Sequence, residues 1–87
     1  MRITNIVGTL QGKTFAISGT LSEVRKVFIE RIEKAGGRFV KNVSNKVSFL
    51  IIGEGAYEKD TTKLEKARQL DIFLITEAEF MRMLNPS

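Results

Sequence analysis

The sequence predicts a three-layer α/β fold, in which a four-stranded parallel sheet of order 2-1-3-4 is flanked by three helices. Strand-like and helix-like segments alternate along the chain, a pattern typical of parallel sheets covered by helices on both faces. The run 48–52 is apolar after its serine, as expected of a strand buried on both faces. Right-handed crossovers then place the first strand centrally, with the second strand on one side and the third on the other.

The length and composition predict one globular domain. The chain has 87 residues, of which 43% are hydrophobic and 28% are charged. We interpret residues 1–9 as a leader and 10–85 as the domain. The longest apolar run, 49–52, is far too short to span a membrane, and the first residues lack a secretory h-region. We therefore expect no membrane partner and an intracellular location, in a bacterial cytoplasm or a eukaryotic nucleus.

The first part of the domain reads as a strand followed by an amphipathic helix. Residues 14–18 form the strand, and apolar residues at helical spacing predict a helix over 23–35. Ser22 is a suitable N-cap for this helix. Gly36 suits a left-handed residue at the helix end, and Gly37 suits a close backbone approach.

The remaining strands alternate with polar connections. We predict a short strand at 38–41, a polar turn at 42–46 and the buried strand at 48–52. A loop with two glycines follows at 53–61. The fourth strand is predicted at 72–75.

A Thr-x-x-Glu pattern occurs twice, and each copy predicts a capping box at a helix start. The first copy, 62–65, opens a helix that ends at Leu70. The second copy, 76–79, opens the last helix, which runs to Leu84. Asn85-Pro86 stops that helix.

The sequence contains no Cys and no His. Without Cys, the protein cannot form disulfides, thiolate metal sites or a thiol nucleophile. Without His, it lacks the usual general base. No predicted strand ends in the clustered acidic residues that a Mg²⁺ site requires. We therefore predict a binding module that is not an enzyme, with no catalytic residue, no metal and no cofactor.

The predicted sheet places a candidate anion site between its first and third strands. The winding reverses there, and ligands of open α/β sheets bind at such a point. Two helix N-termini, at Ser22 and Thr62, open beside it and favour phosphate. Each candidate side chain alone is more often an ordinary turn or surface residue, so their convergence carries the prediction. The candidates are Ser18, Gly19, Thr20, Arg25, Lys63 and Lys66.

The charge balance is mildly basic. Fourteen Lys and Arg residues against ten Asp and Glu residues give a net charge of +4. This favours polyanionic partners such as nucleic acids without specifying one.

Four segments stand out by their sequence and their order: Gly12 to Leu21, Ile32 to Arg38, Val43 to Glu54 and Lys63 to Leu70. Together they resemble the BRCT family. The resemblance covers residues 10–84 and is greatest to the BRCT subgroup of bacterial NAD-dependent DNA ligases and of the replication factor C large subunit. Phe80 stands where many BRCT domains carry Trp, and Asp71 stands where those ligases usually have a glycine.

The resemblance implies a four-stranded parallel sheet with three helices and a non-enzymatic module that recognises phosphate. By position, Ser18, Gly19, Arg25 and Lys63 would be the phosphate ligands. The loop before Lys63 is longer than is usual in the ligases, so Lys59 or Lys66 remains an alternative.

The leading functional hypothesis is a DNA-binding BRCT module that recognises a 5′-phosphate end, within a DNA ligase or another replication or repair protein. The alternative is a protein-interaction BRCT module that binds a phosphopeptide or a neighbouring domain of its parent protein. The basic charge and Arg25 favour DNA.

Overall fold

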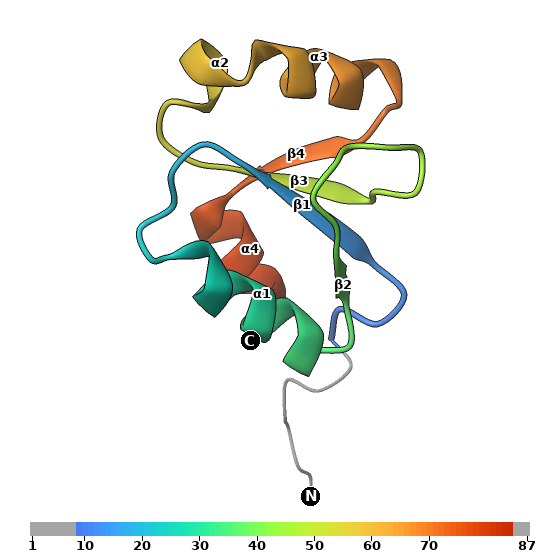
Figure 1. Ribbon diagram of the computed structural model, residues 1–87. Coiled ribbons are helices and arrows are strands. Elements are labelled where there is room, and N and C mark those ends of the chain that lie inside the picture. The colour runs from blue at the N-terminus through green and yellow to red at the C-terminus, as the bar shows by residue number, and fades with distance from the viewer. Residues whose placement is uncertain (1–8, 85–87) are drawn as a thin grey trace, which may run out of the picture.

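A single parallel sheet forms the centre of the protein. The computed structural model describes residues 9–84 (Figure 1). The strands are β1 (Thr14–Ser18), β2 (Arg38–Phe39), β3 (Phe49–Ile52) and β4 (Phe73–Thr76). All pairs are parallel, and the order is β2-β1-β3-β4. The predicted order 2-1-3-4 is thus confirmed.

Helices cover both faces of the sheet. Helices α1 (Arg25–Lys34) and α4 (Glu77–Leu84) lie on one face, and α2 (Ala56–Lys59) and α3 (Thr61–Gln69) lie on the other (Figure 1). The short helix α2 lies inside the predicted loop 53–61, so the prediction of three helices missed one. A helix of four residues is too short for a periodic pattern, and its N-cap residue makes no side-chain capping bond.

The alternation of side chains along β1 divides the core in two. Phe15 and Ile17 pack on the face covered by α1 and α4, whereas Ala16 packs on the face covered by α2 and α3. The ring of Phe80 from α4 lies 5.7 Å from the ring of Phe15 and 5.7 Å from that of Phe28. These two clusters hold the carboxyl end of β1 between two helix layers. The first also contains Leu10, Leu21, Ile32, Ala35, Ile51, Ile75 and Leu84, and the second Val43, Val47, Leu50, Ala56, Leu64, Ala67 and Ile72.

The start of α1 differs from its prediction. The N-cap residue is Val24, and the helix begins at Arg25 rather than at residue 23. The backbone N–H of Ser22 donates to Oε1 of Glu77 at 2.9 Å, and its hydroxyl donates to the other carboxylate oxygen. Ser22 is therefore bonded to α4, and the prediction that it caps α1 was wrong.

Several other bounds shift slightly. β2 ends at Phe39 instead of residue 41, although the Val40 N–H still donates to the Phe15 carbonyl at 2.9 Å. β3 and β4 begin one residue later than predicted. Most of the predicted leader 1–9, and the predicted stop at Asn85-Pro86, lie outside the described residues. Among residues 9–84, no helix has the length and apolar character needed to cross a bilayer.

The end of α1 is as predicted. Gly36 has a φ of 91°, and its N–H donates to the Glu33 carbonyl at 3.1 Å. The Gly37 N–H donates to the Ile32 carbonyl at 2.9 Å, which completes a Schellman motif. A Cβ at Gly37 would lie 3.0 Å from Cγ2 of Ile32 and 3.2 Å from Cβ of Leu10, so the close approach is confirmed.

Helix α3 ends in the same motif without a glycine. Asp71 has a φ of 57°, and its N–H donates to the Arg68 carbonyl at 3.1 Å. The next N–H, of Ile72, donates to the Ala67 carbonyl at 2.9 Å. Asp71 therefore takes the left-handed position that glycine occupies in α1, at a conformational cost.

Candidate functional site

The carboxyl ends of β1 and β3 meet at the predicted reversal of winding. The Gly53 N–H donates to the Ser18 carbonyl at 2.8 Å, where the two strands end. Beyond them, Thr20 and Glu54 form an antiparallel bridge with N···O distances of 2.9 and 2.8 Å. Helices α1 and α3 begin close by in the chain, at Arg25 and Thr61, so two helix N-termini open beside this edge.

Two glycines allow the loops after β1 and β3 to cross in contact. Gly19 has a φ of 82°, and a Cβ there would lie 2.8 Å from the Gly53 carbonyl oxygen. A Cβ at Gly53 would lie 2.3 Å from the Thr20 carbonyl oxygen. Neither position can accept a side chain without moving backbone. Sequence reasoning identified Gly19 and missed Gly53.

The Ser18 hydroxyl faces a residue that sequence reasoning did not single out. Ser18 is fully buried, and its hydroxyl donates to Oδ2 of Asp60 at 2.9 Å. Asp60 lies between α2 and α3, at the N-cap position of α3. Its residue type is a signal for a helix start. Its contact with Ser18, 42 residues away, has no sequence signal.

The surroundings of Asp60 favour its ionised form. The hydrogen bond from Ser18 lowers the pKa of Asp60 most, whereas partial burial opposes this by raising it. The charge of Lys63 lowers the pKa further, followed by the Gly19 N–H and the Arg25 guanidinium. The pKa of Asp60 therefore lies below its ordinary value, so a negative charge is stabilised at the end of β1.

Lys63 reaches the same end of the sheet from the other helix. It is the third residue of α3, not the first as predicted, and its Nζ donates to the Ile17 carbonyl at 3.0 Å. Lys59 and Lys66 are exposed, and neither side chain makes a hydrogen bond or ion pair with the part of the chain that the structure describes. We call Ser18, Gly19 and Lys63, which all act on the Asp60 carboxylate, the β1–α3 site.

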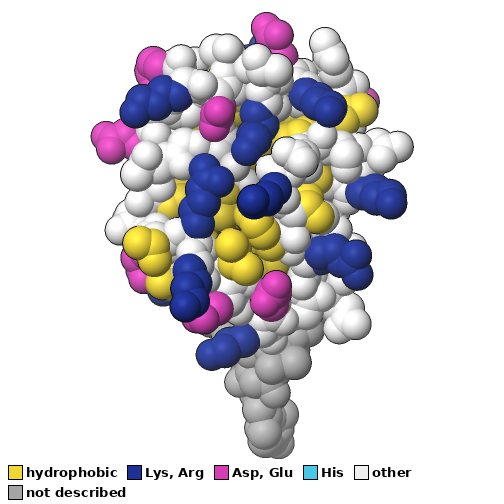
Figure 2. Space-filling view, viewed as in Figure 1, with side chains coloured by type: hydrophobic (Ala, Val, Ile, Leu, Met, Phe, Trp, Pro, Cys, Tyr) yellow, Lys and Arg dark blue, Asp and Glu magenta, His cyan; other side chains and the backbone are white. Residues whose placement is uncertain are grey.

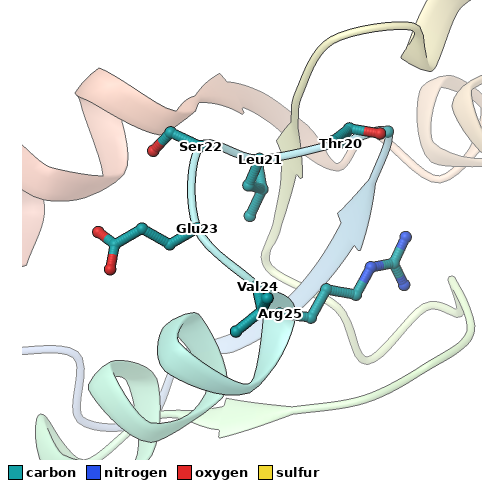
Figure 3. A pocket seen from close by; sticks show the side chains of 7 residues that line it. Thr20, Leu21, Ser22, Glu23, Val24 and Arg25 are labelled. Carbon is teal, nitrogen blue, oxygen red and sulfur yellow. The ribbon is translucent and has the colours of Figure 1, made fainter.

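Thr20 and Arg25 border the neighbouring surface. Residues 19–25 line a surface hollow of about 370 Å³. Figure 3 shows the Arg25 side chain extending on the same side as Thr20, while Ser22 and Glu23 point to the opposite side. Arg25 is exposed and is the first residue of α1. Thr20 and Arg25 thus lie beside the β1–α3 site, and Lys66 is an exposed residue of α3.

One face of the protein is rich in basic side chains. Lys and Arg are spread over the face seen in Figure 2, with fewer Asp and Glu side chains among them and along its margins. Within residues 9–84, no three acidic side chains gather as potential metal ligands. A hydroxyl, a backbone N–H and an ammonium group all favour the ionised Asp60 carboxylate, and groups of these kinds stabilise anions.

The family model for the BRCA1 C Terminus (BRCT) domain matches residues 6–84. The chain belongs to the BRCT family. A DNA ligase of Methylacidiphilum infernorum is 44% identical over 78 residues, and a DNA ligase of Solibacter usitatus is 45% identical over 78 residues. These matches cover 90% and 88% of this chain but only 11% of each relative, so this BRCT module corresponds to a small part of those ligases.

Solved BRCT structures share the fold. The BRCT1,2 pair of Rad4, solved with an Mdb1 phosphopeptide, matches with a TM-score of 0.75 at 19% identity, over 90% of this chain and 41% of that one. The C-terminal BRCT domain of human XRCC1 matches with a TM-score of 0.66 at 19% identity, over 94% of this chain and 90% of that one. The predicted family and fold are therefore confirmed, and the ligase resemblance with them.

Proposed function

We propose that this BRCT module is non-catalytic and binds the 5′-phosphate of a DNA end at the β1–α3 site, as part of a ligase-like protein. One observation carries the proposal: the site already holds an anion, the carboxylate of Asp60, through the Ser18 hydroxyl. Groups that stabilise a carboxylate also stabilise a phosphate oxygen, because both are anionic acceptors.

Charge and position support DNA as the source of the phosphate. The net charge of +4 and the spread of Lys and Arg in Figure 2 favour a polyanion over a short acidic peptide. Arg25 and Thr20 border the adjacent hollow, where the next nucleotide of a DNA strand would lie. The similarity to bacterial DNA ligases supports the same partner.

The second candidate is recognition of a phosphopeptide. The Rad4 BRCT pair, which shares this fold, was solved with a phosphopeptide. A phosphoserine side chain offers the same terminal phosphate as a DNA end. The two candidates therefore share the β1–α3 site and differ in what the surrounding surface contacts.

A titration with matched ligands separates these candidates. The domain is titrated with one duplex carrying either a 5′-phosphate or a 5′-hydroxyl, and with a peptide carrying phosphoserine or serine, at two salt concentrations. We expect tighter binding of the 5′-phosphate duplex and a salt slope of about −0.9 for each further phosphate neutralised. A phosphate preference for the peptide alone would favour the second candidate. Equal affinity for each phosphorylated and unphosphorylated pair would contradict both.

Lys63→Ala tests which lysine acts at the site. Charge-assisted hydrogen bonds contribute about 1.5–3 kcal/mol, so this change should weaken binding of the 5′-phosphate duplex about tenfold or more. The 5′-hydroxyl duplex should lose little. Lys66→Ala tests the alternative register, and Lys46→Ala, at an exposed position between β2 and β3, controls for the lost charge. An equal effect of Lys63→Ala and Lys46→Ala on both duplexes would leave only a generic basic surface.

A further inference from the structure

Asp60 does not make the contact that its position favours. An Asp at the N-cap usually accepts hydrogen bonds from the first N–H groups of its own helix. Asp60 makes no such bond to α3. Its carboxylate instead accepts the hydroxyl proton of Ser18, on a strand 42 residues away in sequence. The carboxylate therefore bonds to the β1–α3 site and leaves its own helix without a side-chain cap.

This contact uses a donor that a phosphate would need. A serine hydroxyl has one proton to donate, and that of Ser18 is directed at Oδ2 of Asp60. Ser18 is fully buried, so its hydroxyl cannot exchange this partner for bulk water. The Gly19 N–H and the Lys63 charge also act on the same carboxylate. A phosphate that arrives at the site meets the Ser18 hydroxyl already bonded to a carboxylate, and the Lys63 ammonium already bonded to the Ile17 carbonyl.

We propose that Asp60 is an internal competitor of phosphate: its carboxylate occupies the β1–α3 site in the free protein and must leave before a phosphate monoester binds. This inference rests on the proposed function and adds to it a residue that weakens binding. Asp60 is only partly buried and lies outside both α2 and α3. When it leaves Ser18, the first N–H groups of α3 remain as donors for its carboxylate, since a helix start lacks intrahelical partners for them.

The competition sets the apparent affinity. A ligand that binds only the open form has its affinity reduced by the fraction of protein in that form. If the site is open about a tenth of the time, phosphate binds about tenfold more weakly than to a site without the competitor. Removing the carboxylate should therefore tighten phosphate binding, which is the reverse of the usual effect of changing a residue inside a binding site.

Titration with inorganic phosphate tests this directly. The backbone amide signal of Gly19 is followed by NMR in the parent, Asp60→Asn and Asp60→Ala. We expect both variants to bind phosphate about tenfold more tightly than the parent. Glu58→Gln is the matched control, because it removes one exposed acidic charge from α2, two residues from Asp60. It should change the affinity less than about twofold, since only screened, long-range repulsion is removed.

Three results would overturn the proposal. The first is that Asp60→Asn binds phosphate no more tightly than the parent. The second is that Glu58→Gln tightens phosphate binding as much as Asp60→Asn does. The third is that the Gly19 amide signal of Asp60→Asn does not respond to phosphate. In the first case Asp60 would only tie α3 to β1. Asp60→Asn keeps the size of the side chain, so it remains the test of the proposal if Asp60→Ala is destabilised.

DNA titrations separate this proposal from the proposed function. Asp60→Asn could bind inorganic phosphate more tightly while no variant prefers the 5′-phosphate duplex. This result would support Asp60 as a competitor of phosphate and overturn DNA-end recognition. A 5′-phosphate preference in the parent that does not increase in Asp60→Asn would overturn the competitor alone.

Discussion

Helices α3 and α4 begin with the same sequence pattern but in different ways. In α4, the Thr76 N–H donates to Oε1 of Glu79 at 2.8 Å, and the Glu79 N–H donates to the Thr76 hydroxyl at 3.1 Å. This is the predicted capping box. In α3, the predicted box 62–65 does not form, because the helix already begins at Thr61 with Asp60 as its N-cap residue.

A helix start can therefore serve either its own helix or another part of the fold. The α4 start satisfies its own backbone groups within four residues. At the α3 start, the residue best suited to cap the helix bonds to β1 instead. The local arrangement can be read from sequence, whereas the one that forms the candidate site cannot.

Ser18→Ala should reduce the stability of the protein most, because it removes the long-range contact between the start of α3 and β1. A hydrogen bond to a charged group contributes about 1.5–3 kcal/mol, and the partly buried Asp60 can regain water, so we expect a loss of about 1.5 kcal/mol. Urea denaturation measures the free energy of unfolding. Thr20→Ala, at an exposed neighbouring position, is the control and should change it by less than about 0.5 kcal/mol.

The dependence of that loss on pH identifies Asp60 as the partner. The folded-state pKa of Asp60 is lowered, with Ser18 as the main cause. The stabilisation is thus present above the pKa of the unfolded chain and disappears as the pH falls through the lower folded-state pKa. The deficit of Ser18→Ala should therefore shrink in acid. A deficit of constant size at every pH would mean that it comes from packing alone.

Thr76→Ala should have the next largest effect, since it removes a functioning capping box. The loss of an N-cap side chain costs about 1 kcal/mol. The matched change Thr62→Ala, in the pattern that forms no box, should cost less than about 0.5 kcal/mol at its exposed position. Thermal unfolding of the two variants compares the two helix starts directly. Equal losses would show that the two starts are energetically alike.

Asp71→Gly should give the smallest effect and the opposite sign. Asp71 is left-handed at the end of α3, as Gly36 is at the end of α1. Relief of the left-handed strain exceeds the entropy that glycine loses on folding, so we expect a gain of about 0.5 kcal/mol in calorimetry. Gly36→Asp is the reverse test and should be destabilising. A loss of stability in Asp71→Gly would mean that the aspartate has a favourable contact of its own.

The sheet could be predicted because its pattern is strong and its topology is restricted. Alternating elements and right-handed crossovers restrict the possible strand orders to very few once β3 is recognised as a buried strand. Weak local signals explain the errors. Helix α2 has only four residues, and Ser22 looks like an N-cap but bonds to Glu77.

The candidate site was partly predictable for the same reason. Ser18, Gly19 and Lys63 lie at the ends of predicted elements, so the topology alone brings them together. Their role toward phosphate stays a prediction. Asp60 was missed, because its position depends on the path of residues 53–60, which only the folded chain defines.

The bridge between Thr20 and Glu54 has a consequence for the speed of binding. Its two hydrogen bonds, with the tight crossing of Gly19 and Gly53, leave the backbone little freedom to lose when a ligand arrives. Under our proposal, phosphate capture requires only that one side chain, that of Asp60, turns away. Side chains with solvent access turn in picoseconds to nanoseconds, far faster than loops or domains close. Diffusion to the site, rather than a conformational step, should then set the association rate.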